Sequence, residues 1–260
     1  MDFEDLTYEE RGATAYITIN RPKVYNAFRG QTVEECIAAF QRAGWNNDIG
    51  SIVFGGSGDK AFCTGGDQSV HDGQYDGRGT TGMPIDELHT IIRDVPKPVV
   101  ARVQGYAIGG GNVLAFLCDM TIASESAIFG QVGPKMGSVD PGWGTAYLAH
   151  VIGEKKAREM WYMCKRYSAA EALEMGLVNI VVPDDKLDET VEEWCNELNK
   201  RSPTAIAIAK KSINADSEHI RGIGSLGFQA LKLYYDSEES QEGVNSFMEK
   251  REPNFRKYVK

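Results

Sequence analysis

The sequence lacks an excess of positive charge. Its 260 residues contain 28 Lys and Arg against 37 Asp and Glu, which gives a formal net charge of −9. The overall field of such a chain does not attract the phosphates of nucleic acid or anionic lipid. We therefore expect no nucleic-acid partner and no membrane partner, while a local basic patch for a small anionic ligand stays open.

Cysteine and long apolar runs are also scarce. The five cysteines are scattered, and no two are spaced as a metal-ligand pair. This pattern indicates reduced thiols in a cytoplasmic protein, with no metal site. The first ten residues are acidic and contain no apolar segment typical of a signal peptide. No apolar run is long enough for a transmembrane helix.

Short apolar strands alternate with amphipathic helices over the first 150 residues. β-Branched and aromatic residues indicate the strands, and apolar residues three and four apart indicate the helices. The predicted strands are 14–20, 52–54, 99–103 and 120–123, and the predicted helices are 31–43, 84–94 and one that begins after Gly111. The segment 129–137 is predicted to be a glycine-rich loop. This alternation is typical of βαβ units and predicts an α/β protein.

Beyond residue 150 the pattern becomes helical. The predicted helices are 155–165, 169–175, 185–200, 204–215, 222–235 and 239–250, with one last short strand at 178–182. We therefore divide the chain into a core of residues 1–200, which carries the ligand site, and a helical C-terminal region of residues 201–260.

Two glycine-rich loops each follow an apolar strand. The first is Cys63–Asp67 (CTGGD) and the second is Gly105–Gly111 (GYAIGGG). Glycine lets a ligand approach the backbone closely, and the exposed N–H groups can then bind it. The spacing is not that of a dinucleotide-binding loop, and a P-loop lysine is missing. Two N–H groups that converge on one oxygen would form an oxyanion hole.

The sequences AFCTGGD and GYAIGGGN resemble the two oxyanion-hole signatures of the crotonase (enoyl-CoA hydratase/isomerase) superfamily. The likeness covers nearly the whole chain and includes RPKVYNAF and FGQVGPKMGSVDPGWG. It implies a ββα spiral core with a helical C-terminal trimerisation region, and a homotrimer or a homohexamer built as a dimer of trimers. It also implies an acyl-CoA thioester ligand, with its thioester oxygen bound by the N–H groups of Gly66 and Gly110.

The hydratases of this superfamily use two glutamates to handle water, and the matching positions here are Val113 and Gly133. Neither residue can transfer a proton, so the resemblance argues against simple hydration of an enoyl thioester.

Within the superfamily, the chain resembles two families that make or break carbon–carbon bonds. The first is the 2-ketocyclohexanecarboxyl-CoA hydrolases, which open a ring to give pimeloyl-CoA in the anaerobic degradation of benzoate and alicyclic acids. The second is the 1,4-dihydroxy-2-naphthoyl-CoA synthases of menaquinone biosynthesis, which close a ring. Residues 69–112, including Asn112, resemble the hydrolases more closely. A non-catalytic acyl-CoA-binding or RNA-binding relative is the remaining alternative.

The same resemblance assigns roles around the reacting atoms. Ser138, Asp140 and Tyr235 match residues that surround them, with Asp140 activating water and Tyr235 acting on the ketone oxygen or the enolate carbon. In bicarbonate-dependent synthases, the positions of Gln131, Gly133 and Trp161 hold that anion. No cofactor is expected, because the substrate carries the coenzyme A, although bound bicarbonate is possible.

The remaining candidates concern the coenzyme A moiety and the edge of the site. The expected substrate-binding residues are Lys23, Tyr25, Phe62, Thr64, Gly65 and Lys250, with Phe62 to Gly65 acting through their backbone. Asp67 is expected at the same site, chiefly to brace the first loop. The glycine-rich segment 70–83 is predicted to be a lid over the site, with Tyr75 reaching the acyl group.

Overall fold

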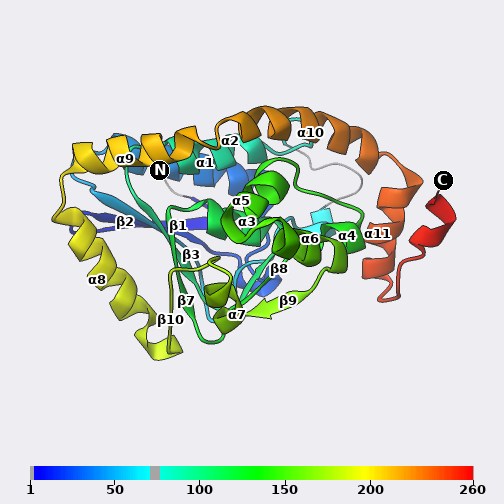
Figure 1. The fold of residues 1–260 in the computed structure, drawn as a ribbon, viewed down its shortest axis with the longest axis horizontal. Helices are drawn as coiled ribbons and strands as arrows, with labels where there is room; N and C mark the ends of the chain where they lie inside the picture. The colour runs from blue at the N-terminus through cyan, green and yellow to red at the C-terminus, as the bar shows by residue number, and fades with distance from the viewer. Residues whose placement is uncertain (1–2, 71–76, 260) are drawn as a thin grey trace.

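The computed structural model describes residues 3–70 and 77–259, which form two β-sheets packed with helices (Figure 1). The larger sheet has six strands in the order β1-β2-β3-β5-β7-β10. β1 and β2 form an antiparallel hairpin, and the other neighbours are parallel. These strands are β1 (Leu6–Arg11), β2 (Thr14–Ile19), β3 (Ser51–Gly56), β5 (Val99–Val103), β7 (Met120–Ser124) and β10 (Ile180–Val182).

The smaller sheet has four strands in the order β4-β6-β8-β9. They are β4 (Ala61–Cys63), β6 (Tyr106–Ile108), β8 (Ile128–Gly130) and β9 (Arg166–Ser168). The first three are parallel, and β9 is antiparallel to β8. The chain passes from the larger sheet to the smaller one and then into a helix three times, as β3-β4-α2, β5-β6-α3 and β7-β8-α4. The predicted ββα spiral is therefore confirmed.

Helices cover both faces of the larger sheet. α1 (Gly30–Trp45), α2 (Ile85–Asp94) and α3 (Gly110–Leu117) belong to the main core, which includes Ile52 and Phe54 of β3. Val53 points to the opposite face and packs under α8 (Leu187–Asn199), because successive side chains of a strand alternate between faces. A strand buried on both faces reads as a continuous apolar run, and all six residues of β3 are buried.

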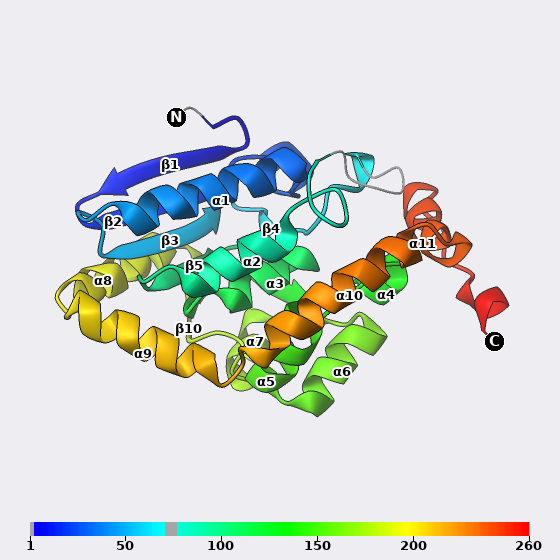
Figure 2. The same ribbon diagram turned by 90° about the horizontal axis from the view of Figure 1, so that it is seen from above.

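The predicted C-terminal helices are confirmed. Figures 1 and 2 show α9 and α10 running along one side of the molecule, with α11 and the C-terminus beyond their far end. Besides α8, the α-helices that follow β8 are α4 (Gly133–Met136), α5 (Leu148–Ile152), α6 (Glu154–Met163), α7 (Ala169–Glu174), α9 (Pro203–Ala215), α10 (His219–Tyr235) and α11 (Glu238–Met248). No helix within the described ranges is long and apolar enough to cross a bilayer.

The sequence prediction was wrong in two places that matter for the site. The segment 129–137 is not a loop throughout, because β8 ends in it at Gly130 and α4 follows at Gly133–Met136. α3 begins at Gly110 and not after Gly111. Elements of three or four residues have too few positions to establish a periodicity, which is also why β4, β6 and β9 were missed.

An ion pair between a buried lysine and a partly exposed aspartate attaches α9 to the core. The Lys210 ammonium donates to the Asp119 carboxylate at 2.7 Å and to the backbone carbonyls of Ile92 and Lys97 at 2.9 and 3.0 Å. The same Asp119 oxygen accepts the Val99 N–H. One ammonium therefore joins α9 to the C-terminal end of α2 and to the start of β5.

We expect Lys210→Ala to lower the free energy of unfolding by about 2–3 kcal/mol, because it removes a buried ammonium that donates to two carbonyls and to the partly exposed Asp119. Chemical denaturation measures this loss. The matched control is Lys211→Ala, which removes an exposed ion pair to Asp94 and should cost under about 1 kcal/mol. Equal losses in the two variants would contradict the role given to the buried lysine.

Candidate active site

The register of the smaller sheet brings three glycine-bearing loops together. β4, β6 and β8 are parallel neighbours, with Ala61 opposite Tyr106 and Tyr106 opposite Ile128. The carboxyl ends of parallel strands lie at the same edge of a sheet. The segments that follow these strands, 64–67, 109–112 and 131–144, therefore start at one edge, and they carry most of the predicted site residues.

The first two loops touch at Gly65 and Gly110. Gly65 has a φ of +86°, and a Cβ atom placed on it would lie 3.0 Å from the Gly110 nitrogen. A Cβ on Gly110 would in turn lie 3.5 Å from the Gly65 Cα. Only glycine combines this backbone conformation with so close an approach. At Gly110 the restriction comes from Phe28, because a Cβ there would lie 2.7 Å from Cζ of its ring.

The N–H groups of Gly66 and Gly110 have no backbone acceptor within the described part of the chain. Gly110 is the first residue of α3, so its N–H lies at the positive end of a helix dipole. Gly66 pairs with Phe28 in an isolated bridge whose hydrogen bonds use the neighbouring Gly65 carbonyl and Asp67 N–H. Both glycines are half-buried. Two N–H groups from adjoining loops thus lack a backbone acceptor, and their binding of one oxygen stays a prediction.

Asp67 braces the first loop. Its Oδ1 accepts the N–H and the hydroxyl of Ser69, and its Oδ2 lies 2.9 Å from the Arg21 guanidinium. Burial raises the pKa of this carboxyl, but the bonds from Ser69 and Arg21 outweigh it and hold the pKa below its usual value. Asp67 therefore braces the first loop, with Oδ1 bonded to Ser69 and Oδ2 paired with Arg21 on the turn after β2.

The two positions where hydratases have glutamates leave no room for an acid. Val113 is fully buried in the main core. A Cβ on Gly133 would lie 2.5 Å from the Ser138 carbonyl oxygen and 2.6 Å from Cζ3 of Trp161. No side chain fits at Gly133 without moving this backbone.

Asp140 is the carboxyl group of the third loop. Its Oδ1 accepts the Gly144 N–H at 3.1 Å, and its side chain is only 14% exposed. Burial raises the pKa of Asp140 to about 7, and the Gly144 hydrogen bond opposes this only in part. A carboxyl that titrates near neutrality can both take and return a proton.

Close backbone approaches position Asp140. A Cβ on Gly144 would lie 2.4 Å from the Asp140 Cβ, and a Cβ on Gly227 of α10 would lie 2.2 Å from the Pro141 Cβ. The segment Trp143–Tyr147 then forms a π-helical turn. Gly144 in the loop and Gly227 on α10 thus allow the close packing that fixes the position of Asp140.

Ser138 and Tyr235 form a hydrogen-bonded pair beside Asp140. Their hydroxyl oxygens lie 2.8 Å apart, and Tyr235 is 8% exposed. Burial raises the pKa of Tyr235 to about 12, the bond to Ser138 lowers it in part, and the charge of Asp140 adds to the rise. The structure therefore brings together the three residues predicted to surround the reacting atoms, with Tyr235 supplied by the C-terminal region.

His89 on α2 is a residue that the sequence interpretation missed. Its side chain is fully buried, and Nε2 lies 3.8 Å from Asp140 Oδ2. Burial lowers the pKa of the imidazole to about 3, so it is neutral. The available signal was its position: His89 shares a helix face with Ile85, Leu88 and Ile92, where an apolar residue is expected.

The predicted anion site contains one unpaired amide. Gln131 is buried, and neither its side-chain oxygen nor its nitrogen has a partner among the described residues. The Trp161 indole N–H donates to the Gly144 carbonyl at 2.7 Å, so only the ring of Trp161 faces Gly133. Asn112 is buried, with its Oδ1 unpaired. Anion binding at Gln131, Gly133 and Trp161 stays a prediction.

Residues predicted to hold coenzyme A lie beside the first loop. Lys23 and Tyr25 are exposed on the turn after β2, and the Thr64 hydroxyl donates to the Tyr25 carbonyl at 3.3 Å. The Phe62 ring is buried against Phe54, so only its backbone can meet a ligand. Lys250 lies apart from this turn, and Tyr75 falls outside the described residues.

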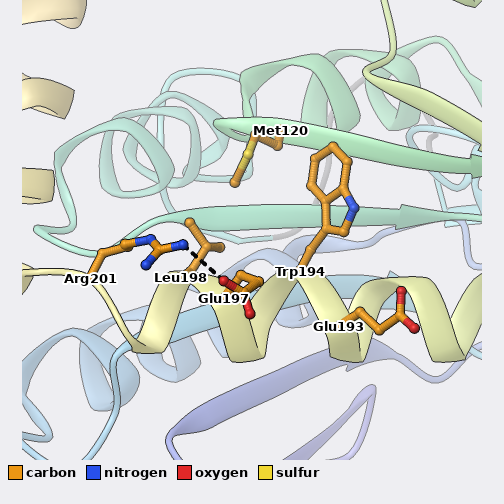
Figure 3. Close-up of a pocket in the computed structure, with 6 residues that line it drawn as sticks. All are labelled: Met120, Glu193, Trp194, Glu197, Leu198 and Arg201. Carbon is orange, nitrogen blue, oxygen red and sulfur yellow. Dashed lines mark hydrogen bonds and ion pairs between the residues drawn. The ribbon is translucent and has the colours of Figure 1, made fainter.

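Two surface pockets lie elsewhere. Lys250 lines one of about 380 Å³ between α4 and α11, with Lys135, Phe247 and Arg251. Figure 3 shows the other, of about 430 Å³, where Trp194 and Leu198 of α8 lie beside Met120 of β7. Neither contains the glycine loops. No group of three or more His, Cys, Asp or Glu that could hold a metal occurs in residues 3–70 or 77–259.

Comparisons with known proteins agree with this architecture. The sequence profile of the family described as enoyl-CoA hydratase/isomerase matches residues 9–258. An enoyl-CoA hydratase from Mycobacterium avium subsp. paratuberculosis is 29% identical, with a TM-score of 0.88, over 98% of this chain and 99% of that one. A carnitinyl-CoA hydratase from Mycobacterium avium is 28% identical, with a TM-score of 0.83, over 97% and 98%. An enoyl-CoA hydratase from Bacillus anthracis is 28% identical, with a TM-score of 0.74, over 97% and 99%.

The raised pKa of Asp140 has a consequence for stability. The folded pKa of about 7 lies above the unfolded value of 3.8, so unfolding releases a proton between these pH values and this residue's contribution becomes less favourable as pH rises. As the pH rises from 4 to 8, we expect the free energy of unfolding of Asp140→Asn to increase by about 2–4 kcal/mol relative to that of the native protein. Denaturation curves at several pH values measure the difference. A pH-independent difference would contradict the buried, neutral carboxyl.

Proposed function

Because the chain belongs to the enoyl-CoA hydratase/isomerase family, the crotonase superfamily, we propose that it is an enzyme that opens the ring of a cyclic β-keto acyl-CoA by hydrolysis. The proposed reaction converts 2-ketocyclohexanecarboxyl-CoA and water into pimeloyl-CoA. The observation that carries the proposal is the grouping of Tyr235 with Asp140 and Ser138, which lie on a loop that starts at the same sheet edge as the Gly66 and Gly110 loops.

The proposed reaction has three steps. Water, deprotonated as it attacks, adds to the ring ketone carbon. The bond between that carbon and the α-carbon then breaks, and its electron pair forms the thioester enolate while the ketone carbon becomes a carboxyl group. Finally the α-carbon takes up a proton. One water is consumed and no oxidant or reductant is needed.

Each residue has a role that fits its environment. The enolate oxygen gains negative charge during bond cleavage, and the Gly66 and Gly110 N–H groups would bind it more strongly than the neutral thioester. Asp140 would take the proton from water, which its pKa of about 7 suits at neutral pH. Tyr235, held by Ser138, would donate to the ketone oxygen or to the enolate carbon.

Simple hydration of an enoyl thioester fits this chain poorly, although the similar structures include hydratases. Hydration in the family uses two acids, and Val113 and Gly133 provide none. The contacts of Gly133 with Ser138 and Trp161 leave no space for a glutamate. The carboxyl of the third loop is Asp140, and a single such group suits carbon–carbon chemistry better than the two-acid addition of water.

The assembly and setting are proposed from the same family membership. We infer a homotrimer or homohexamer in the cytoplasm, formed through the C-terminal region of residues 201–260. Apolar side chains on α9 and α10 support this, because they are more exposed than is usual for a monomer's surface. They are Ile208, Ile213, Ile223, Leu226 and Leu233.

One observation favours a second candidate, the ring-closing 1,4-dihydroxy-2-naphthoyl-CoA synthase reaction. The buried Gln131 amide has no partner, and bicarbonate bound beside Gly133 would satisfy it. In that reaction the anion would act as the base. Asn112, which stands where the synthases usually have histidine, favours the hydrolase.

Incubation with 2-ketocyclohexanecarboxyl-CoA, followed by mass spectrometry, tests the proposed function. We expect a gain of one water, and in H₂¹⁸O the label should appear in the new carboxyl group. An unchanged substrate, together with loss of water from o-succinylbenzoyl-CoA, would instead support the synthase. Turnover of neither compound would contradict both reactions.

Gly65→Ala tests the contact between the two glycine loops. The added Cβ would meet the Gly110 nitrogen at 3.0 Å at a φ of +86°, so the two N–H donors should separate. We expect kcat to fall about 100-fold or more while KM changes much less. Gly176→Ala is the control, since its φ is +76° but nothing lies within 4 Å of the new Cβ. An equal loss of kcat in the control would point to backbone strain alone.

A further inference from the structure

His89 is a buried polar group that the proposed mechanism does not use. It lies on α2, and neither ring nitrogen has a hydrogen-bond partner among the described residues. A buried donor or acceptor without a partner typically costs about 1–3 kcal/mol. An apolar residue would fill the same position without this cost, so the imidazole requires an explanation.

The group that faces His89 is Asp140. Nε2 of His89 and Oδ2 of Asp140 are 3.8 Å apart, too far for a hydrogen bond. Oδ1 of Asp140 accepts the Gly144 N–H, while Oδ2 has no other partner in the described part of the chain. Asp140 thus has one unused carboxylate oxygen and His89 has two unused ring nitrogens, of which Nε2 is the one beside that oxygen.

The other titratable or charged groups around the pair have contacts of their own. Arg93, one turn along α2 from His89, places its guanidinium 4.5 Å from the ring centres of both Trp143 and Tyr147 and donates through Nη2 to the Ser217 hydroxyl, while its Nε has no partner among the described residues. Tyr235 on α10 shares its hydroxyl with Ser138. Phe228 of the same helix lies beside the imidazole, with ring centres 6.3 Å apart. His89 is thus the side-chain donor placed to serve Asp140.

We propose that His89 is a positioning residue for Asp140, whose Nε2–H closes onto Oδ2 and holds the carboxylate ionised and correctly oriented to take a proton from water. This rests on the proposed function of Asp140. The closure needs a movement of only about 1 Å to bring Nε2 and Oδ2 within hydrogen-bond distance, in the ligand-free protein as well as in the complex.

The imidazole stays neutral in this arrangement and keeps its own proton. A neutral donor favours the carboxylate over the carboxylic acid, so it opposes the effect of burial on Asp140. The proton that Asp140 takes from water remains on Asp140 and is available to the enolate carbon. His89 therefore acts through Asp140 and does not touch the substrate.

The test is a titration of the Asp140 carboxyl by ¹³C NMR in the ligand-free protein, comparing the native chain with His89→Phe and His89→Gln. We expect His89→Phe to raise the pKa of Asp140 by about one unit, and the Gln amide to restore much of the native value. The acid limb of the kcat/KM profile should shift by the same amount, which lowers kcat/KM about tenfold on that limb. His150→Phe, a change at an exposed histidine stacked on Tyr147, should leave both unchanged.

Unchanged Asp140 titration in both His89 variants would overturn the proposal, even if their stability falls. If His89→Phe does not fold, the proposal is tested instead by the ¹⁵N chemical shifts of the His89 ring nitrogens, measured in the native protein and in Asp140→Asn. A ring-nitrogen shift that depends on Asp140 supports the pair, and its absence overturns it. Because these spectra need no substrate, a failed ring-opening assay with a shifted Asp140 pKa would contradict only the proposed function.

Discussion

The close contact between two glycine loops is the constraint on which the site depends. A Cβ on Gly65 would lie 3.0 Å from the Gly110 nitrogen at a φ of +86°, and this contact joins two loops whose Gly66 and Gly110 N–H groups have no backbone acceptor among the described residues. The fold creates it because β4 and β6 are parallel neighbours, so their following loops start at one edge. Backbone donors fixed in this way need no reorganisation when negative charge develops on a bound oxygen.

The third loop and α10 contribute the side chains proposed to transfer protons beside this donor pair. β8 is the next parallel neighbour, so Asp140 and Ser138 follow from the same edge. α10 packs against that loop at Gly227 and contributes Tyr235. The C-terminal helices therefore form part of the site. Because Asp140 is buried, its pKa rises to about 7, where an exposed carboxyl would be fully ionised.

Sequence reasoning predicted the fold class and most helices because their apolar periodicities extend over ten residues or more. It also predicted that the residues near Gly66, Gly110 and Asp140 would meet, but this came from the resemblance of their motifs to a known family. Periodicity could not reveal β4, β6 or α4, whose lengths of three or four residues fix no pattern. Periodicity does place His89 on the apolar face of α2, but only the tertiary packing shows that Asp140 lies beside it.

The central claim is that Gly66 and Gly110 together polarise a thioester carbonyl. The most direct measurement is the isotope-edited Raman spectrum of a ¹³C-labelled, non-cleavable β-keto acyl-CoA analogue bound to the protein. Two hydrogen bonds to one oxygen should shift the thioester carbonyl band to lower frequency than in water, and Gly65→Ala should remove the shift. A bound carbonyl with the same frequency as in water would contradict the oxyanion hole and the account built on it.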